Sequence, residues 1–267
     1  MSPSCPVPDG IDPQVLRAAG FASVEILAEA GSTMERAREL AAAGECPLPA
    51  AVVADRQTAG RGRRGAHWWQ PPGSLVVSIV VQAARGGPPP PSWSLACGVA
   101  LAETLREIEP AVAAVVRWPN DIEVAGRKLA GILVEAVAAG RVIFGIGVNT
   151  TGTAADAPPP LRSRVATLPD VAGRSVARER VLAAFLPRFR GLLAAVAADP
   201  AALAGRYRPL CGLEGKAVTI HVGPERHRGI CRGIAADGSL VLDTSTGRMQ
   251  FASGSLTDPA DVWCGGG

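Results

Sequence analysis

The stretch "AAVVADRQTAGRGRRGAHWWQPPGSLVVSIVVQ", Ala50–Gln82, holds two apolar runs separated by a loop rich in arginine and glycine. The flanking runs "AAVVADRQ" and "SLVVSIVVQ" are apolar and β-branched, which predicts two strands. In "GRGRRG", residues 60–65, three arginines alternate with three glycines. Glycine costs about 0.5–1 kcal/mol relative to alanine inside a helix or strand, so this segment is a loop, and its backbone can approach a bound molecule closely. Because arginine binds phosphate and carboxylate in bidentate fashion, the sequence predicts an anion-binding loop between two strands.

The same loop has a second interpretation. Arginine-rich glycine segments also occur as solvated basic loops that contact RNA. Gln57 and Trp68 flank the loop, and they offer an amide partner and a flat apolar wall, which favours a pocket.

Other periodic segments predict an α+β body. "GSTMERARELAAAG" begins a helix that Ser32 or Thr33 can cap and that ends at Gly44. We expect longer helices over 93–108 and 176–198, and a short one over 200–207. Three apolar runs, 114–124, 128–137 and 141–149, are separated by tight turns and predict an antiparallel meander. A proline-rich linker covers residues 84–92.

After Gly212 the pattern changes to short strands separated by turns at Gly223, Asp237–Gly238 and Thr246–Gly247. This pattern predicts a small β-barrel. We therefore divide the chain into an N-terminal arm at residues 1–24, the α+β body at 25–210 and the small barrel at 211–264.

A second unusual block is "RWPNDIEVAGRKLAGILVE", residues 117–135. Pro119 ends regular strand pairing, so Asn120 and Asp121 are expected at the irregular end of a strand. Lys128 has the ordinary interpretation of a solvated residue at a strand edge. The small residue Gly131 nearby suggests instead that something packs against this backbone.

Two further positions have a structural and a functional interpretation. Asn149 either ends a strand or reads a base with its amide. Ser32 and Thr33 cap a helix by default, but a helix N-terminus also favours anionic groups.

Composition restricts the function. The 267 residues carry 27 basic and 24 acidic side chains, a net charge of +3, so anion binding must be local. Six cysteines without a C-x-x-C pair and three histidines do not fit a zinc site, and they predict free thiols in a reducing cytoplasm. We see neither a signal-peptide pattern nor an apolar run near the roughly 20 residues of a membrane span, so we expect a soluble cytoplasmic protein without membrane contact.

Four blocks together resemble a known family. "GSTM", "DRQTAGRGRRGAHW", "RWPNDIEVAGRKLAGILVE" and "GIGVN", in this order and spacing, closely resemble the biotin protein ligases. The resemblance runs from about residue 25 to residue 150, and the small C-terminal barrel fits the same family. It implies a mixed, largely antiparallel sheet with helices, as in class II synthetases and biotinyl and lipoyl ligases, followed by an SH3-like β-barrel.

The resemblance implies a two-step reaction. Biotin and ATP first form biotinyl-5'-AMP with release of pyrophosphate, and biotin then passes to a lysine of a biotin carboxyl carrier protein. Mg²⁺ would be carried in with ATP, with few protein ligands. A homodimer is left open.

The family's functional residues fall within the quoted blocks. The catalytic residues implied are Lys128, Arg61, Arg63 and Asp121. The biotin-binding residues implied are Ser32, Thr33, Met34, Gln57, Arg61, Gly62, Arg63, Lys128 and Gly131. The residues implied for ATP and the adenylate are Arg63, Trp68, Lys128 and Asn149. No metal ligand is assigned.

Fixed cations suit this reaction because a carboxylate and a triphosphate repel each other. The loop glycines would let the loop fold over the adenylate and exclude water. Two residues depart from the family pattern. Met34 stands where asparagine is common, so a polar contact is lost or replaced by packing. Arg117 stands where lysine is usual, which keeps the charge but changes the geometry.

Three other functions compete with this one. Lipoyl-attaching enzymes share the fold but lack the "GRGRRG" loop. A biotin-responsive transcription regulator would need a DNA-binding domain, and the thirty or so residues before "GSTM" are too few for a three-helix domain, so we expect no specific DNA binding. An RNA-binding protein is disfavoured by the nearly balanced charge.

Overall fold

The computed structural model describes residues 10–257, apart from residue 45 and residues 84–88. The opening of the predicted arm, most of the predicted linker, the last residues of the predicted barrel, and Cys5 and Cys264 lie outside this range. The described cysteines, Cys46, Cys97, Cys211 and Cys231, are free thiols, as predicted.

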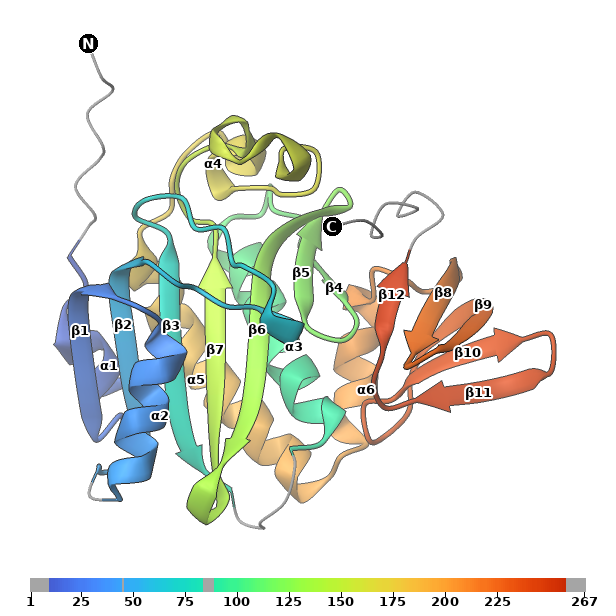
Figure 1. Cartoon of the computed structure of the whole chain (residues 1–267), viewed down its shortest axis with the longest axis horizontal. Coiled ribbons are helices and arrows are strands. Elements are labelled where there is room, and N and C mark those ends of the chain that lie inside the picture. The colour runs from blue at the N-terminus through green and yellow to red at the C-terminus, as the bar shows by residue number, and fades with distance from the viewer. Residues whose placement is uncertain (1–9, 45, 84–88, 258–267) are drawn as a thin grey trace.

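A seven-stranded sheet forms the centre of the body, in the order β1-β2-β3-β7-β6-β5-β4 (Figure 1). The pair β1–β2 is parallel and all other neighbours are antiparallel. The prediction of an α+β fold with a mixed, largely antiparallel sheet is therefore confirmed. The strands are β1 (Ser23–Ala30), β2 (Ala50–Gln57), β3 (Leu75–Gln82), β4 (Val115–Arg117), β5 (Asp121–Val124), β6 (Arg127–Val137) and β7 (Arg141–Val148).

Helices cover both faces of this sheet (Figure 1). One face carries α2, and the other carries α1, α3 and α5. On β2, Val52 packs beneath α2, whereas its neighbour Val53 belongs to the core beneath α3 and α5. A strand buried on both faces is apolar at consecutive positions, which explains the run "AAVVA". The helices of the body are α1 (Pro13–Ala18), α2 (Thr33–Ala43), α3 (Pro91–Ile108), α4 (Leu168–Ala172), α5 (Arg178–Ala198) and α6 (Ala202–Tyr207).

Among the described residues, α5 is the one helix long and apolar enough to cross a membrane. Its large apolar side chains are mostly buried in the protein instead, namely Val181, Leu182, Phe185, Leu186, Phe189, Leu192 and Val196. The ring of Phe189 meets Phe144 of β7 edge-on, with centroids 5.0 Å apart, and stacks on Phe185 at 5.4 Å. We therefore interpret α5 as a core helix.

A second, five-stranded sheet follows the body. Its order is β11-β10-β9-β8-β12, with all neighbours antiparallel. The strands are β8 (Ala217–Val222), β9 (Glu225–Ile234), β10 (Leu240–Thr244), β11 (Gly247–Phe251) and β12 (Ser255–Thr257). The predicted C-terminal β domain is present, whereas its description as an SH3-like barrel stays a prediction, as do the domain limits at residues 25, 210 and 264.

The two sheets share one apolar core. Leu240 and Leu242 of β10 belong to the same hydrophobic cluster as the body's α3 and α5. Hydrogen bonds also cross between the two parts. The indole nitrogen of Trp118 donates to the carbonyl of Gly238 at 3.0 Å, and the backbone nitrogen of Gly212 donates to Val116 at 3.0 Å.

Within the predicted N-terminal arm, residues 1–24, the structure contains a helix that the sequence did not predict. Residues 13–18 form helix α1, which begins with a proline and is capped by Asp12, whose carboxylate accepts from Gln14 N at 2.8 Å. Leu16 of this helix is fully buried. The sequence did not reveal this helix because six residues are too few to show apolar periodicity. The helix is stabilised by its packing on α5 and β1 and not by its own sequence pattern.

The run 114–124, predicted as one strand, is two. β4 and β5 pair antiparallel, with Arg117 opposite Asp121, and the chain reverses between them at Trp118, Pro119 and Asn120. Proline has no N–H for a strand ladder, which favours a turn at this position. This hairpin turn carries Asn120 and Asp121 to the candidate site.

Candidate active site

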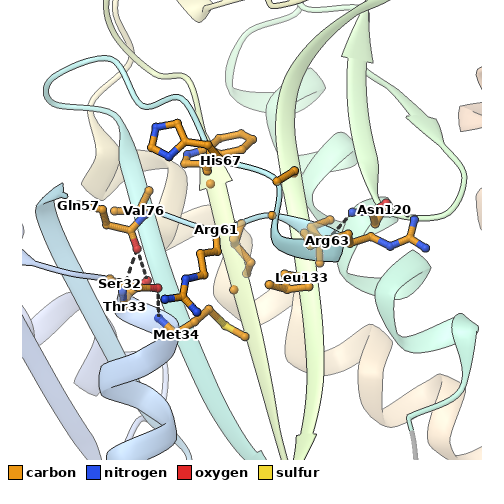
Figure 2. A pocket seen from close by; sticks show the side chains of 18 of the residues that line it. Ser32, Thr33, Met34, Gln57, Arg61, Arg63, His67, Val76, Asn120 and Leu133 are labelled. Carbon is orange, nitrogen blue, oxygen red and sulfur yellow. Dashed lines mark hydrogen bonds between the residues drawn. The ribbon is translucent and has the colours of Figure 1, made fainter. Parts of the chain in front are cut away.

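A cavity of about 230 Å³ lies on the sheet face that carries α2. Its wall combines the start of α2, the end of β2, the Arg/Gly loop (residues 60–68) and the strands β3, β5, β6 and β7 (Figure 2). The predicted site residues that line it are Ser32, Thr33, Met34, Gln57, Arg61, Gly62, Arg63, Trp68, Asp121, Lys128 and Gly131. Asn149 is the one predicted site residue that does not line it.

The floor of the cavity is made by glycines on neighbouring strands. Gly131 of β6 pairs directly with Gly147 of β7. A Cβ at Gly147 would lie 2.6 Å from the indole of Trp68, and one at Gly131 would lie 3.0 Å from the same ring. The missing side chains therefore create the slot in which the indole lies. At Gly145 the same absence leaves room for Met34, whose sulfur would be 2.6 Å from an added Cβ.

One end of the cavity is a polar network. The side-chain oxygen of Gln57 accepts from both the backbone nitrogen and the hydroxyl of Thr33, at 2.8 and 3.1 Å. Ser78 of β3 donates to the Thr33 hydroxyl at 2.9 Å. Ser32 caps α2 by accepting from Met34 N at 3.2 Å, as the sequence predicts (Figure 2). These bonds fix Thr33 and leave the α2 N-terminus facing the cavity.

The Arg/Gly loop folds back on itself as a narrow hairpin. Gly62 N donates to Ala66 O at 2.7 Å and Trp68 N donates to Gly60 O at 3.0 Å. At the tip, Gly65 has a φ of +77°, a backbone conformation that side chains disfavour. The hairpin crosses the front of β7 and β6 (Figure 1), which places arginines at the cavity mouth.

The two cavity-lining arginines of the loop have different partners. Arg61 reaches the first turn of α2 and forms an ion pair with Glu35 at 2.9 Å. Arg63 donates to the side-chain oxygen of Asn120 at 3.2 Å and to the carbonyl of Gly254 at 3.2 Å. Burial, and secondly the charge of Arg64, lower the pKa of Arg63. Its partners are neutral oxygens, so its charge remains available to an anion.

Lys128 reaches the cavity because of a β-bulge. Lys128 pairs with Glu123 and Ala130 with Ile122, so Leu129 is an extra residue in β6. In a regular strand, residues three apart lie on opposite faces; the bulge brings Lys128 and Gly131 onto the same face. Lys128 Nζ lies 2.7 Å from the carboxylate of Asp121 and 5.5 Å from the centre of the Trp68 ring.

Comparison with known proteins assigns the chain to a family. Residues 30–150 match the model of the Biotin/lipoate A/B protein ligase family. The chain is 30% identical over 222 residues to the biotin–[acetyl-CoA-carboxylase] ligase of Paracoccus denitrificans, which covers 80% of this chain and 90% of that protein. The chain belongs to the biotin protein ligase family.

Two other relatives extend the comparison. The bifunctional ligase/repressor BirA of Bacillus subtilis is 30% identical over 234 residues, covering 84% of this chain and 70% of that protein. The solved structure of the biotin protein ligase from Aquifex aeolicus in complex with biotin and ATP has a TM-score of 0.77 and 27% identity, covering 89% of this chain and 98% of that one.

In this member of the biotin protein ligase family, Asn149 is buried and holds the backbone of a neighbouring segment. It is 1% exposed, and its side-chain nitrogen donates to Ala166 O at 2.9 Å. It therefore holds a segment that runs parallel to β6, where Lys128 N donates to Arg164 O at 2.8 Å. The Asn149 side-chain oxygen has no hydrogen-bond partner among the described residues. Asn149 thus supports the backbone of Lys128, and its predicted contact with adenosine stays a prediction.

Several cavity residues were not predicted. Asn120, which holds Arg63, stands in the quoted "WPND" block beside Asp121 and could have been included. Gly145 and Gly147 alternate in "FGIGV", the pattern of one strand face without side chains. Glu35 and Ser78 do not line the cavity but hold the lining residues Arg61 and Thr33, and they carry no distinctive local signal.

No group of three or more histidine, cysteine, aspartate or glutamate side chains is placed to hold a metal ion within the part of the chain that the structure describes. Asp121 is the carboxylate that lines the cavity, and it is paired with Lys128. A divalent ion would therefore need oxygen ligands from the substrate itself.

Proposed function

We propose that this protein is an ATP-dependent ligase that makes biotinyl-5'-AMP from biotin and ATP, and then transfers biotin to a lysine of a carboxylase carrier protein. The observation that carries the proposal is a single cavity with a polar end at Thr33 and Gln57, an apolar slot at Trp68, and three cations, Arg61, Arg63 and Lys128. The names of the relatives and the biotin and ATP in the Aquifex aeolicus complex support it.

Substrate binding follows from the two ends of the cavity. The hydroxyls of Ser32 and Thr33 and the amide of Gln57 suit the ureido group of biotin, whose carbonyl and N–H groups need fixed partners. The glycine floor and Trp68 suit an apolar ring and chain. The acid group would then extend toward Lys128.

In the first step, a biotin carboxylate oxygen attacks the α-phosphorus of ATP while the bond to pyrophosphate breaks. Both reactants are anions, so cations at fixed positions lower the barrier. Lys128 is restrained by Asp121, and Arg63 by two neutral oxygens, so both cations are positioned before the substrates arrive. Mg²⁺ would enter with the ATP phosphates.

In the second step, the neutral amine of the acceptor lysine attacks the acyl carbon, the bond from this carbon to the phosphate oxygen breaks and AMP leaves, and the amine gives up its excess proton to Asp121 or to solvent. Asp121 is the cavity-lining carboxylate able to accept a hydrogen bond from this amine. The acceptor lysine must therefore enter at the side of the cavity formed by β5 and β6. The choice of a biotin carboxyl carrier domain as acceptor, the cytoplasmic location and a homodimer stay predictions.

The test is a transfer assay. The purified protein should release pyrophosphate from ATP only when biotin is present, and should add the mass of one biotin to a carrier domain. A carrier whose acceptor lysine is replaced by arginine is the matched control. Lipoate in place of biotin tests the lipoyl-attaching alternative, and transfer of lipoate alone would contradict the proposal.

Specific DNA binding is expected to be absent. A gel-shift assay at physiological salt should show no sequence-dependent complex, with and without biotin. A sequence-dependent complex that requires biotin would favour the transcription-regulator alternative.

A further inference from the structure

The Arg/Gly loop contacts the C-terminal sheet at the point where β12 begins. Arg63 Nη2 donates to the carbonyl of Gly254 at 3.2 Å, and Arg64 Nη1 donates to the hydroxyl of Ser255. These partners are separated by 191 positions in the chain. Both contacts come from consecutive loop arginines to consecutive residues of one segment, so the segment binds the loop tip as a unit.

Gly254 cannot be another residue without local change. Its φ is +157°, and an added Cβ would lie 2.7 Å from Ile220 of β8 and 3.0 Å from the carbonyl of His221. Pairing continues at once beyond it, since Ser255 lies opposite His221 in the β8–β12 ladder. The direction of the Gly254 carbonyl is therefore set by backbone packing on β8.

Arg63 is held from two sides. Its Nη1 donates to Asn120, whose amide nitrogen in turn donates to Ile132 O on β6 at 2.7 Å. The other side is the Gly254 carbonyl from the C-terminal sheet. The guanidinium of Arg63 thus bridges the body and the C-terminal sheet while it lines the cavity.

The C-terminal sheet is fixed relative to the body by contacts away from the loop. Ser92 N donates to Asp237 O at 3.1 Å, and Trp118 donates to Gly238 O at 3.0 Å. An added Cβ at Gly238 would lie 2.4 Å from Ser92 N, so the two backbones touch there. The sheet can therefore act as a rigid support for the loop.

We propose that Gly254 and Ser255 are positioning residues of the ligase reaction: they hold Arg63 and Arg64 where the loop closes the cavity, so that the C-terminal sheet helps to retain the acyl-adenylate. The proposal rests on the proposed function, because it concerns the intermediate of that reaction. Neither residue lines the cavity, and both act through the arginines.

The test compares Ser255→Ala with Ser253→Ala, an exposed serine two positions earlier. The first readout is amide hydrogen exchange of Gly60–Ala66 in the ligand-free protein. Losing one hydrogen bond to an arginine should speed this exchange by about three- to tenfold in Ser255→Ala. Thermal unfolding midpoints within about 2 °C of wild type would show that the fold is intact.

The second readout is release of the intermediate. Adenylate labelled from [α-³²P]ATP is formed on the enzyme, and its loss to solution is followed without acceptor. Ser255→Ala should release it about three- to tenfold faster, while the rate of adenylate formation at saturating substrates changes less than about twofold. Gly254→Ala, which moves the carbonyl itself, should exceed this effect.

The outcomes separate the two proposals. Equal loop exchange and equal release in Ser255→Ala and Ser253→Ala would overturn the positioning role. A wild-type protein that forms no adenylate would overturn the proposed function, while the exchange comparison in the ligand-free protein would still decide whether Ser255 holds the loop.

Discussion

Lys128 and Asp121 lie on adjacent antiparallel strands, and their ammonium and carboxylate groups are 2.7 Å apart at the edge of the cavity. Their side chains are 34% and 26% exposed, so this is a partly solvated pair that contributes little to stability. Its consequence is geometric. Asp121 keeps Lys128 extended over Gly131. An incoming carboxylate or phosphate would replace the Asp121 carboxylate as the partner of the Lys128 ammonium group.

Lys128→Ala should abolish adenylate formation while leaving the protein folded. Pyrophosphate release with biotin and ATP measures the activity, and we expect a loss of at least about a hundredfold. The free energy of unfolding should fall by about 1 kcal/mol or less, because the lost ion pair is partly exposed. Arg127→Ala removes the neighbouring cation, which does not line the cavity, and should retain activity. Wild-type pyrophosphate release by the Lys128 variant would refute this role.

Glu35→Gln should strengthen the binding of ATP. In the ligand-free protein Arg61 is paired with Glu35, so an anion must compete for the guanidinium. An exposed pair is worth about 0.2–1 kcal/mol, so the Kd for ATP should fall by about two- to fivefold. Titration calorimetry with ATP measures it. Glu39→Gln, on the same helix but paired with Arg36, is the control. An unchanged or weaker affinity would mean that the pair does not restrain Arg61.

Gly147→Ala should damage the cavity without unfolding the protein. The added Cβ would meet the indole of Trp68 at 2.6 Å and displace it from the slot. Overpacking of this kind costs about 1–3 kcal/mol, so we expect biotin affinity to fall by about ten- to a hundredfold. Gly191→Ala, where an added Cβ meets nothing within 4 Å inside helix α5, should instead stabilise the protein by up to about 1 kcal/mol. Biotin affinity unchanged by Gly147→Ala would contradict the assigned slot.

Arg63→Gly should produce a ligase that releases its acyl-adenylate into solution before transfer. A charge-assisted contact to the adenylate phosphate is worth about 1.5–3 kcal/mol, so release should be about ten- to a hundredfold faster. Escaped adenylate would label a bystander such as albumin, detected by blotting for biotin. Arg64→Gly removes the same charge and adds the same glycine one position away, and should label less. If adenylate is made but albumin stays unlabelled, Arg63 does not retain the intermediate.

Local features of the site could be predicted from the sequence, and long-range ones could not. The cap at Ser32, the strand pair around the Arg/Gly loop and the presentation of Asp121 follow from residues within a few positions of one another. The slot at Gly131 and Gly147 depends on strand register, which no single segment specifies.

The other features that the sequence did not predict also depend on contacts between distant segments. Helix α1 is too short to show a period and depends on packing for its stability. The bond from Arg63 to Gly254 joins residues 191 positions apart, and it requires the C-terminal sheet to be docked before it can form. The sequence predicts the C-terminal domain but leaves its role open, because nothing in its own pattern points toward the cavity.

The apolar core that runs without a break from Phe144 of the body to Leu242 of the C-terminal sheet has a practical consequence. A chain cut after residue 210 would expose apolar side chains of one shared hydrophobic cluster, including those where α6 packs on β9. Such fragments should aggregate rather than fold separately. A shortened or transplanted version of this enzyme would therefore have to keep both sheets as a single folding unit. Fusion partners would have to be attached at the chain ends and not at the boundary between the body and the C-terminal sheet.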